Sequence, residues 1–217
     1  MIEVPYIYKM IKVFPPEEDQ YISKSALEGR VWDAWMIPYI AQASKMGGAI
    51  VDVGANIGLD SVLFSCFAPV WAFEPVHHEI LKHNVTGTLY PVAVEPYALS
   101  NHTGTSTVYL WDGPNKGACS LNSEIGQKSV QIELKRMDDV ITGAVSFIKI
   151  DVEGHEMEVL EGARQIIERY KPVMCVETFE HLEDLKKFAD EIGYIIQNAP
   201  EHNYIMVSRH NFPSQDI

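Results

Sequence analysis

Two short segments of the chain carry residues with the chemistry of a ligand-binding turn and of a proton-transfer site. The first, DVGANIG at residues 52–58, follows a short apolar run. Its glycines allow a tight turn in which backbone N–H groups can approach a ligand closely. The second, KIDVEGHE at residues 149–156, places five titratable side chains within eight residues. A group of acids with a histidine can move protons near neutral pH.

The spacing of the glycines in the first segment disfavours cofactors that contain phosphate. A dinucleotide-binding turn reads GxGxxG and a Walker loop ends in GK[ST]. Here three residues separate Gly54 from Gly58, and Leu59 and Asp60 follow. Asp52 and Asp60 would repel phosphate and attract a cation. S-Adenosylmethionine carries a sulfonium and an ammonium group and no phosphate, so it suits this turn.

An acidic residue ends the next apolar run, at Glu74, 16 residues after Gly58. A carboxylate can accept hydrogen bonds from both hydroxyls of a ribose. Pro75 biases Glu74 toward an extended backbone, which would keep the side chain at the tip of a strand. In an open parallel sheet, ligands bind at the carboxyl ends of the strands. The turn and Glu74 together therefore predict an S-adenosylmethionine site.

The second segment supplies the candidate catalytic residues Asp151, Glu153 and His155. Transfer of a methyl group to a hydroxyl needs an aligned acceptor oxygen and a group that takes its proton. Asp151 ranks first by its position at a strand tip, His155 has a suitable ordinary pKa, and crowding can raise the pKa of a carboxyl. Which of the three is the base stays open. The alternative for Glu153 and Glu156 is electrostatic support of a helix N-terminus.

Short apolar runs alternate with segments of helical periodicity along most of the chain. The alternation predicts an α/β fold with a mostly parallel sheet covered by helices on both faces. The last two strands are joined too tightly for a parallel crossover, so one of them is predicted to be antiparallel. Strands are predicted over 49–53, 70–73, 89–94, 145–150, 173–176, 194–197 and 204–207, and helices over 26–43, 59–67, 77–84, 155–170 and 182–192.

The domain organisation is predicted as an N-terminal lid or cap over 1–48, a catalytic domain over 49–210 and a disordered tail over 211–217. Residues 1–20 resemble an extended arm. The 26–43 helix contains Pro38, which would kink or split it.

An insertion over 100–136 interrupts the alternation of strands and helices. Two predicted strands, 105–111 and 129–135, flank a loop over 112–128 that is rich in Gly, Ser and Asn. Loops of this length are usually functional or mobile. We interpret this one as a substrate lid, with a plain surface insertion as the alternative.

Composition limits the partners. The 217 residues include 17 Lys and Arg against 30 Asp and Glu, a formal charge of −13. This charge disfavours nucleic acid and anionic membranes. No apolar stretch is long enough to span a bilayer, and we expect a cytoplasmic protein.

Cys66, Cys119 and Cys175 are too far apart in sequence for a CxxC metal site. Asp151, Glu153 and His155, with a later Glu177 or His181, could bind a divalent metal, but the spacing does not establish such a site and we expect none.

With these residues in view, the sequence resembles the FkbM-type S-adenosylmethionine-dependent methyltransferases. The resemblance implies the class I methyltransferase fold, a Rossmann-like three-layer sandwich with a seven-stranded sheet that has one antiparallel strand. It also implies methyl transfer, most often to a hydroxyl of a sugar or secondary metabolite. The segments that carry it are VDVGANIGLDS (51–61), FEPVHHEILKHNV (73–85), YALSNHTGTSTVYL (97–110), FIKIDVEGHEMEVLEGA (147–163) and KPVMCVE (171–177).

The resemblance also assigns positions around the cofactor. Asp151 to Glu156 would lie beside the transferred methyl group, and Asn84 matches a helix-end position for which we favour a capping role. The cofactor-binding residues would be Asp52, Gly54, Ala55, Asn56 and Gly58 for the methionine half, Glu74 with Pro75 for the ribose, and Tyr97 and Ala98 near the adenine.

Two rival functions remain at this point. The first is an NAD(P)-dependent oxidoreductase of Rossmann type. A YxxxK pattern at Tyr8 and Lys12 would fit it, but the pattern lies upstream of the cofactor turn, where a short-chain dehydrogenase would not place it. The second is a non-catalytic cofactor-binding module of the same fold.

For the methyltransferase, the partner expected is a small-molecule or glycan hydroxyl acceptor, and the oligomeric state is open.

Overall fold

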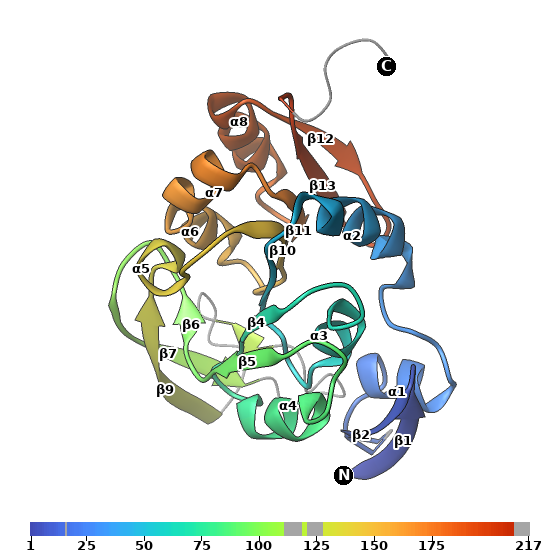
Figure 1. The fold of residues 1–217 in the computed structure, drawn as a ribbon. Coiled ribbons are helices and arrows are strands. Elements are labelled where there is room, and N and C mark those ends of the chain that lie inside the picture. Colours follow the sequence, from blue (N-terminus) through green and yellow to red (C-terminus); the bar gives the residue numbers. More distant parts are fainter. Residues whose placement is uncertain (16, 111–118, 121–127, 211–217) are drawn as a thin grey trace.

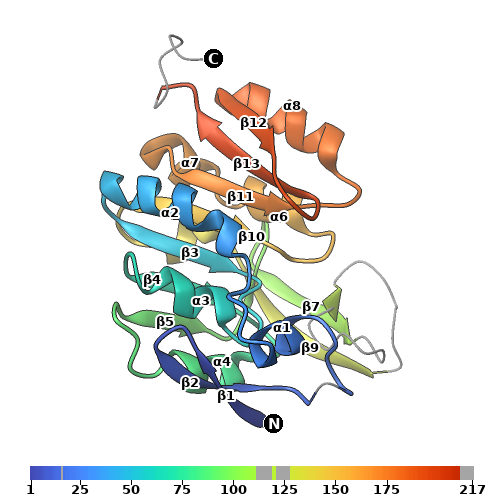
Figure 2. The same cartoon turned by 90° about the vertical axis from the view of Figure 1, so that its right-hand side faces the viewer.

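The computed structural model describes residues 1–15, 17–110, 119–120 and 128–210. Its centre is a seven-stranded sheet (Figures 1 and 2). The strands lie in the order β12 (Tyr194–Asn198), β13 (Asn203–Ser208), β11 (Val173–Glu177), β10 (Val145–Ile150), β3 (Ala49–Val53), β4 (Val70–Phe73) and β5 (Val92–Glu95). Strand β13 is antiparallel to both of its neighbours, and the other adjacent pairs are parallel. The predicted sheet with one antiparallel strand is confirmed.

Helices cover both faces of this sheet. Strand residues alternate between the two faces: Ile50 packs in one hydrophobic cluster, and its neighbour Val51 packs in the other. The first face carries α2 (Ile37–Ala43), α3 (Leu59–Phe64) and α4 (His78–Val85), and the second carries α5 (Met137–Val140), α6 (Glu156–Glu161), α7 (Arg164–Tyr170) and α8 (Leu182–Ile192). None of the described helices is long and apolar enough to cross a membrane.

The N-terminal region differs from its prediction. The expected extended arm is an antiparallel hairpin of β1 (Ile2–Tyr6) and β2 (Lys9–Val13). The single helix expected over 26–43 is wrong: the chain forms α1 (Ile22–Leu27), the 3₁₀ turn η1 (Ala34–Met36), α2 and a second turn η2 (Ser44–Met46). Gly29 has φ +73° and ends the first helical stretch. Pro38 lies in the first turn of α2, where its missing N–H leaves no hydrogen bond unmade, so it begins a helix instead of kinking one.

The insertion forms a second, four-stranded sheet. It contains β6 (Ala98–Leu99), β9 (Lys128–Lys135), β7 (Gly104–Leu110) and β8 (Cys119–Ser120), in that order. The long strands β7 and β9 correspond to the two strands predicted over 105–111 and 129–135, and they pair antiparallel. The lid expected over 112–128, apart from 119–120 and 128, lies outside the described residues, as do Trp111 and the tail 211–217.

The helix predicted over 155–170 is divided into α6 and α7 at Gly162. A Cβ atom at Gly162 would lie 2.0 Å from the carbonyl oxygen of Ser100, so the insertion contacts the helix backbone directly here. The carbonyl of Gly162 also accepts a hydrogen bond from the backbone N–H of Asp138, at 3.0 Å. These contacts come from distant segments, and helical periodicity alone does not predict them.

Candidate active site

A cavity of about 920 Å³ opens at the carboxyl ends of the central strands. Its volume lies at the upper end of the usual range for small-molecule sites, roughly 300–1,000 Å³. Gly54, Glu74, Asp151 and Glu177 reach its wall from the ends of β3, β4, β10 and β11. The N-terminal segment contributes residues between Gln20 and Trp32 to the lining. The cavity therefore lies where an open parallel sheet binds ligands.

The turn after β3 packs tightly against the end of β10. Gly54 has φ +85°, and its N–H donates to the carbonyl of Phe73 at 3.0 Å. A Cβ atom at Gly54 would lie 1.8 Å from the carbonyl oxygen of Asp151. No side chain fits between the two strands, so glycine is required for this contact as well as for the turn.

The Glu74 carboxylate ties the end of β4 to this turn. One oxygen accepts a hydrogen bond from the N–H of Asn56 at 3.0 Å. The other accepts from the N–H groups of Val76 and His77 at 2.7 and 2.8 Å. Both Glu74 and Pro75 lie in the cavity wall. A carboxylate oxygen can accept two hydrogen bonds, so the oxygen that Asn56 contacts can accept another from a ligand.

Other residues predicted for the cofactor site lie behind the wall. Asp52 lies beneath the turn, fully buried, and accepts a hydrogen bond from the Ser61 hydroxyl at 2.5 Å. Burial raises the pKa of Asp52 to about 6, although Lys149 and Ser61 oppose the shift. Ala55 and Gly58 line a smaller neighbouring cavity of about 20 Å³, large enough for a single water molecule.

On the side expected to hold the adenine, the structure separates two adjacent residues. Ala98 lies in the cavity wall. The ring of Tyr97 packs instead against Phe73, with 5.6 Å between ring centroids, and the amine of Lys135 lies 3.9 Å from its centroid. Tyr97 therefore supports the wall from behind.

The three catalytic candidates all lie in the wall of the large cavity. The side chain of Asp151 is 29% exposed and lies 3.1 Å from the amine of Lys149. Glu153 has φ +52°, a left-handed backbone that is uncommon outside glycine. Partial desolvation, followed by the charges of Asp151 and Glu156, raises the pKa of Glu153 to about 7. A carboxyl of this kind exchanges its proton near neutral pH.

His155 lies beside the same strand tip and packs against the insertion. Its Nε2 atom lies 3.0 Å from the hydroxyl of Ser100. Burial lowers the pKa of His155, against the opposing charge of Glu158, so the imidazole is neutral at pH 7. Glu156 accepts a hydrogen bond from the N–H of Gly154 at 2.7 Å, at the start of α6. The helix-supporting alternative therefore describes Glu156, whereas Glu153 lines the cavity.

The cavity wall also contains residues that sequence reasoning did not assign. Burial, and then the charge of Asp151, raises the pKa of Glu177 to about 8. Phe179 is 64% exposed, and its ring centroid lies 4.6 Å from that of His202. The sequence suggests Glu177 only as a metal ligand, and Phe179 lies outside any motif. Within the described ranges, no three His, Cys, Asp or Glu side chains are placed to hold a metal ion.

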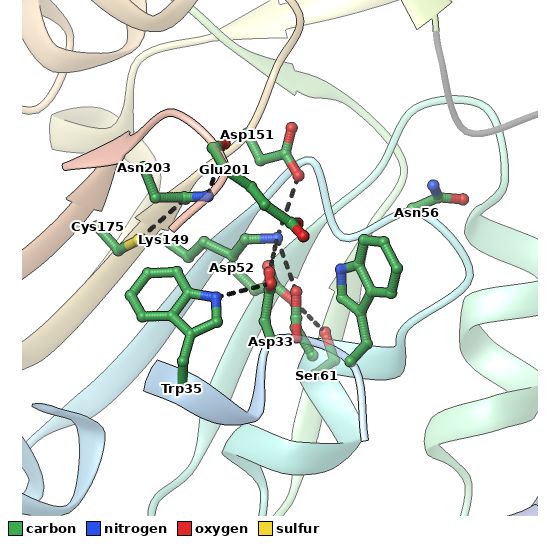
Figure 3. A network of polar contacts seen from close by, with 12 residues as sticks. Asp33, Trp35, Asp52, Asn56, Ser61, Lys149, Asp151, Cys175, Glu201 and Asn203 are labelled. Carbon is green, nitrogen blue, oxygen red and sulfur yellow. Dashed lines mark hydrogen bonds and ion pairs between the residues drawn. The ribbon is translucent and has the colours of Figure 1, made fainter. Parts of the chain in front are cut away.

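A buried lysine, Lys149, lies next to the catalytic candidate Asp151 (Figure 3). Lys149 is 3% exposed, and its amine lies 2.7 Å from Asp60, 3.1 Å from Asp151 and 3.6 Å from Asp33. Burial alone would lower the pKa of Lys149, but these carboxylates together hold it well above its usual value. A lysine inside an apolar strand, VSFIKI, was a sequence signal for such partners.

Comparison with known proteins agrees with this geometry. The sequence model of the methyltransferase FkbM domain matches residues 52–206, from the glycine turn to β13. The chain belongs to the FkbM methyltransferase family. The match includes every candidate catalytic residue and leaves the hairpin, α1 and α2 outside.

Three known proteins are similar to this chain. The hexuronic acid methyltransferase AglP of Haloferax volcanii is 29% identical over 133 residues, which cover 58% of this chain and 54% of AglP. The methyltransferase sdnD of Sordaria araneosa is 28% identical, with 75% of this chain and 76% of the relative covered. A crystal structure of methyltransferase FkbM from Methylobacillus flagellatus superposes with a TM-score of 0.54 at 22% identity, over 75% of this chain and 44% of that one. The chain thus spans about half the length of AglP.

Proposed function

We propose that this FkbM-family chain is an S-adenosylmethionine-dependent methyltransferase that methylates a hydroxyl group of a sugar or secondary metabolite. The observation that carries the proposal is the Glu74 carboxylate, which lies in the cavity wall and is bonded to the backbone of the glycine turn at Asn56. Family membership and the class I fold support the same activity.

The donor set of the cavity fits this cofactor. Glu74 would accept a hydrogen bond from a ribose hydroxyl through the oxygen that also contacts Asn56, and the backbone from Gly54 to Asn56 would border the methionine half. Ala98 offers a small apolar surface beside Leu99 for the adenine. No lysine or arginine occurs in the turn, which agrees with a cofactor that lacks phosphate. When bound, S-adenosylmethionine supplies an electrophilic methyl group.

The chain's own residues handle the acceptor proton in this proposal. Glu153, whose carboxyl exchanges its proton near neutral pH, accepts the proton of the acceptor hydroxyl. Asp151 lies two residues before it on the same wall and orients the acceptor. His155 is engaged with Ser100, and we assign it to holding the insertion against this wall.

The acceptor side of the cavity suits a hydroxylated ring without negative charge. Phe179 and His202 present aromatic surface, and Glu177 and Glu201 present carboxyls that can bind hydroxyl groups. The name of AglP, a hexuronic acid methyltransferase, supports a sugar as the acceptor class. The acidic wall favours a neutral sugar over a uronate.

Calorimetric titration tests the cofactor assignment. We expect S-adenosylhomocysteine and S-adenosylmethionine to bind with micromolar or tighter affinity and NAD⁺ not to bind. Glu74→Gln should weaken S-adenosylhomocysteine binding by about 10- to 150-fold, because a hydrogen bond to a charged acceptor contributes roughly 1.5–3 kcal/mol. Glu79→Gln, which changes an exposed carboxylate on α4, is the matched control and should bind as the wild type does.

Three results would count against the proposal. Binding of NAD⁺ without binding of S-adenosylhomocysteine would favour an oxidoreductase. Unchanged affinity in Glu74→Gln would remove Glu74 from the ribose site. Tight cofactor binding with no methyl transfer to any hydroxylated acceptor would instead favour a non-catalytic module of the same fold.

A further inference from the structure

The charges around Lys149 come from parts of the chain that are distant in sequence. The titratable groups that face its amine, directly or through their charge, are Tyr6 on β1, Asp33 before η1, Asp52 on β3, Asp60 on α3, Asp151 after β10, and Cys175 and Glu177 on β11. One cation therefore serves several buried carboxyls. The amine can remain in place only while these carboxyls surround it, because an unpaired buried charge is strongly unfavourable.

Lys149 contacts the active-site wall through Asp151. The two side chains lie on the same face of β10 and its extension, with 3.1 Å between amine and carboxylate. The backbone N–H of Asp151 donates to the carbonyl of Val53 at 3.0 Å, which fixes the main chain. With the main chain fixed, the contact with Lys149 determines where the partly exposed carboxylate points.

Asp33 brings the N-terminal segment into this contact. Its side chain is 7% exposed, with one oxygen 3.6 Å from the Lys149 amine and the other accepting a hydrogen bond from the Trp35 indole at 3.1 Å. Asp33 has φ +48°, a left-handed conformation that persists where surrounding contacts hold it. The preceding Trp32 lies in the walls of both cavities, and its N–H donates to the Tyr6 hydroxyl at 3.0 Å.

We propose that Lys149 is a positioning residue for Asp151, and that Asp33 makes this position depend on the docking of the N-terminal segment 20–33. The segment forms one wall of the cavity, and its last residue shares the cation that holds the opposite wall. Docking of the N-terminal segment, which closes the cavity, and placement of the Asp151 carboxylate therefore occur together. The role of Asp151 in this inference rests on the proposed methyltransferase function; the coupling between Asp33 and Lys149 does not.

Asp33→Asn and Lys149→Met change opposite charges in the same cluster, so they separate an electrostatic role from simple loss of structure. Asp33 raises the pKa of Asp60, which is about 7, and Lys149 lowers it. In ¹³C NMR titrations, Asp33→Asn should move the Asp60 midpoint to lower pH and Lys149→Met should move it to higher pH. Glu18→Gln, an exposed change in the same N-terminal region, is the control and should leave it unchanged.

Docking of the segment is read by trypsin, which cleaves after Lys24 and Arg30, both exposed. Removing one partner of a buried ion pair releases the element that carries it, so Asp33→Asn should speed cleavage at Arg30 by about ten-fold. Addition of S-adenosylhomocysteine should slow cleavage in the wild type and much less in the variant. In the double variant Asp33→Asn/Lys149→Met, the increase in the cleavage rate at Arg30 should be smaller than the product of the increases in the two single variants, because the two residues interact.

The outcomes distinguish the coupling between Asp33 and Lys149 from the proposed function. Unchanged cleavage and an unchanged Asp60 midpoint in Asp33→Asn would overturn the inference, even if Lys149→Met fails to fold. Failure of the wild type to bind S-adenosylhomocysteine would contradict the proposed function alone, since the ligand-free cleavage and titration would still report the coupling.

Discussion

At the scale of single residues, Glu153 combines a left-handed backbone with a position on the cavity wall. Backbone strain in a non-glycine residue often marks a functional site, where the surrounding structure holds the residue in place. The next residue is Gly154, with φ +98°, and the chain then enters α6. Two successive positive φ angles turn Glu153 out of the strand path, and desolvation in the cavity then brings its pKa close to physiological pH.

This geometry predicts the pH dependence of the reaction. A base acts when ionised, so kcat/KM should rise with pH through about 7, the pKa of Glu153, and level off above it. Glu153→Gln should lower kcat by about 100- to 10,000-fold and remove this limb, because the amide cannot accept the proton. Initial rates with an acceptor that turns over measure both effects, and Glu168→Gln on the exposed side of α7 is the control.

A different profile would reassign the base. Suppose that Glu153→Gln retains most of the activity and that its kcat/KM rises with pH at a midpoint below 6.5, the ordinary pKa of histidine. The proton acceptor is then His155, because burial lowers the pKa of this residue.

At the scale of elements, Asn84 joins the N-terminal hairpin to the cofactor turn. Its side-chain amide donates to the carbonyls of Lys12 and Ile57, both at 2.8 Å, and its oxygen accepts from the N–H of Lys12 at 2.7 Å. The capping role expected for Asn84 is therefore not the role it has. It lies near the end of α4 but binds backbone groups of two other segments.

Removing this side chain should destabilise both segments. Asn84→Ala leaves buried backbone groups without partners, each at a cost of about 1–3 kcal/mol. We expect a lower free energy of unfolding in urea and weaker S-adenosylhomocysteine binding, because Ile57 belongs to the cofactor turn. Asn198→Ala, at an exposed position on β12, should change neither. Lower stability with wild-type affinity would show that the turn does not depend on this contact.

Local sequence patterns predicted the elements well where the pattern itself determines the structure. Apolar runs bounded by glycine became β3 and β10, and α8 occupies the predicted residues 182–192. The prediction of a single helix over 26–43 was wrong because Pro38 is compatible with either a kink or a helix start. Only tertiary contacts decide between the two. In the site, the motif residues Glu74 and Asp151 could be predicted. Asp33 could not, since its partner Lys149 lies more than a hundred residues away.

At the scale of the whole molecule, the excess of negative charge extends into the cavity. The formal charge is −13, and acidic residues outnumber basic ones in the cavity wall. The basic residues there, Lys24 and Arg30, come from the N-terminal segment, and Arg30 is paired with Glu28 at 2.7 Å. The acidic residues are Glu28, Glu74, Asp151, Glu153, Glu177 and Glu201, of which Glu153 and Glu177, with pKa values of about 7 and about 8, become fully charged only above neutral pH. An anionic ligand would meet a repulsive field.

This field predicts acceptor selectivity. A neutral sugar should have a kcat/KM about ten-fold higher than its uronate counterpart at low ionic strength, and the difference should narrow as salt screens the charges. Rates measured on such a pair at two salt concentrations test it. A uronate preference, or a ratio that salt does not change, would show that contacts other than charge select the acceptor.

The ion pair between Asp33 and Lys149 also limits how this chain can be recombined with its relatives. The glycine pair at Gly47 and Gly48 is an attractive junction for grafting one protein's N-terminal region onto another's catalytic core. A chimera made there would separate Asp33 from Lys149, and would leave the interior of the recipient with a mismatched charge. Exchange should succeed only when the donor supplies an acid at the equivalent place, or when the crossover lies upstream of Trp32.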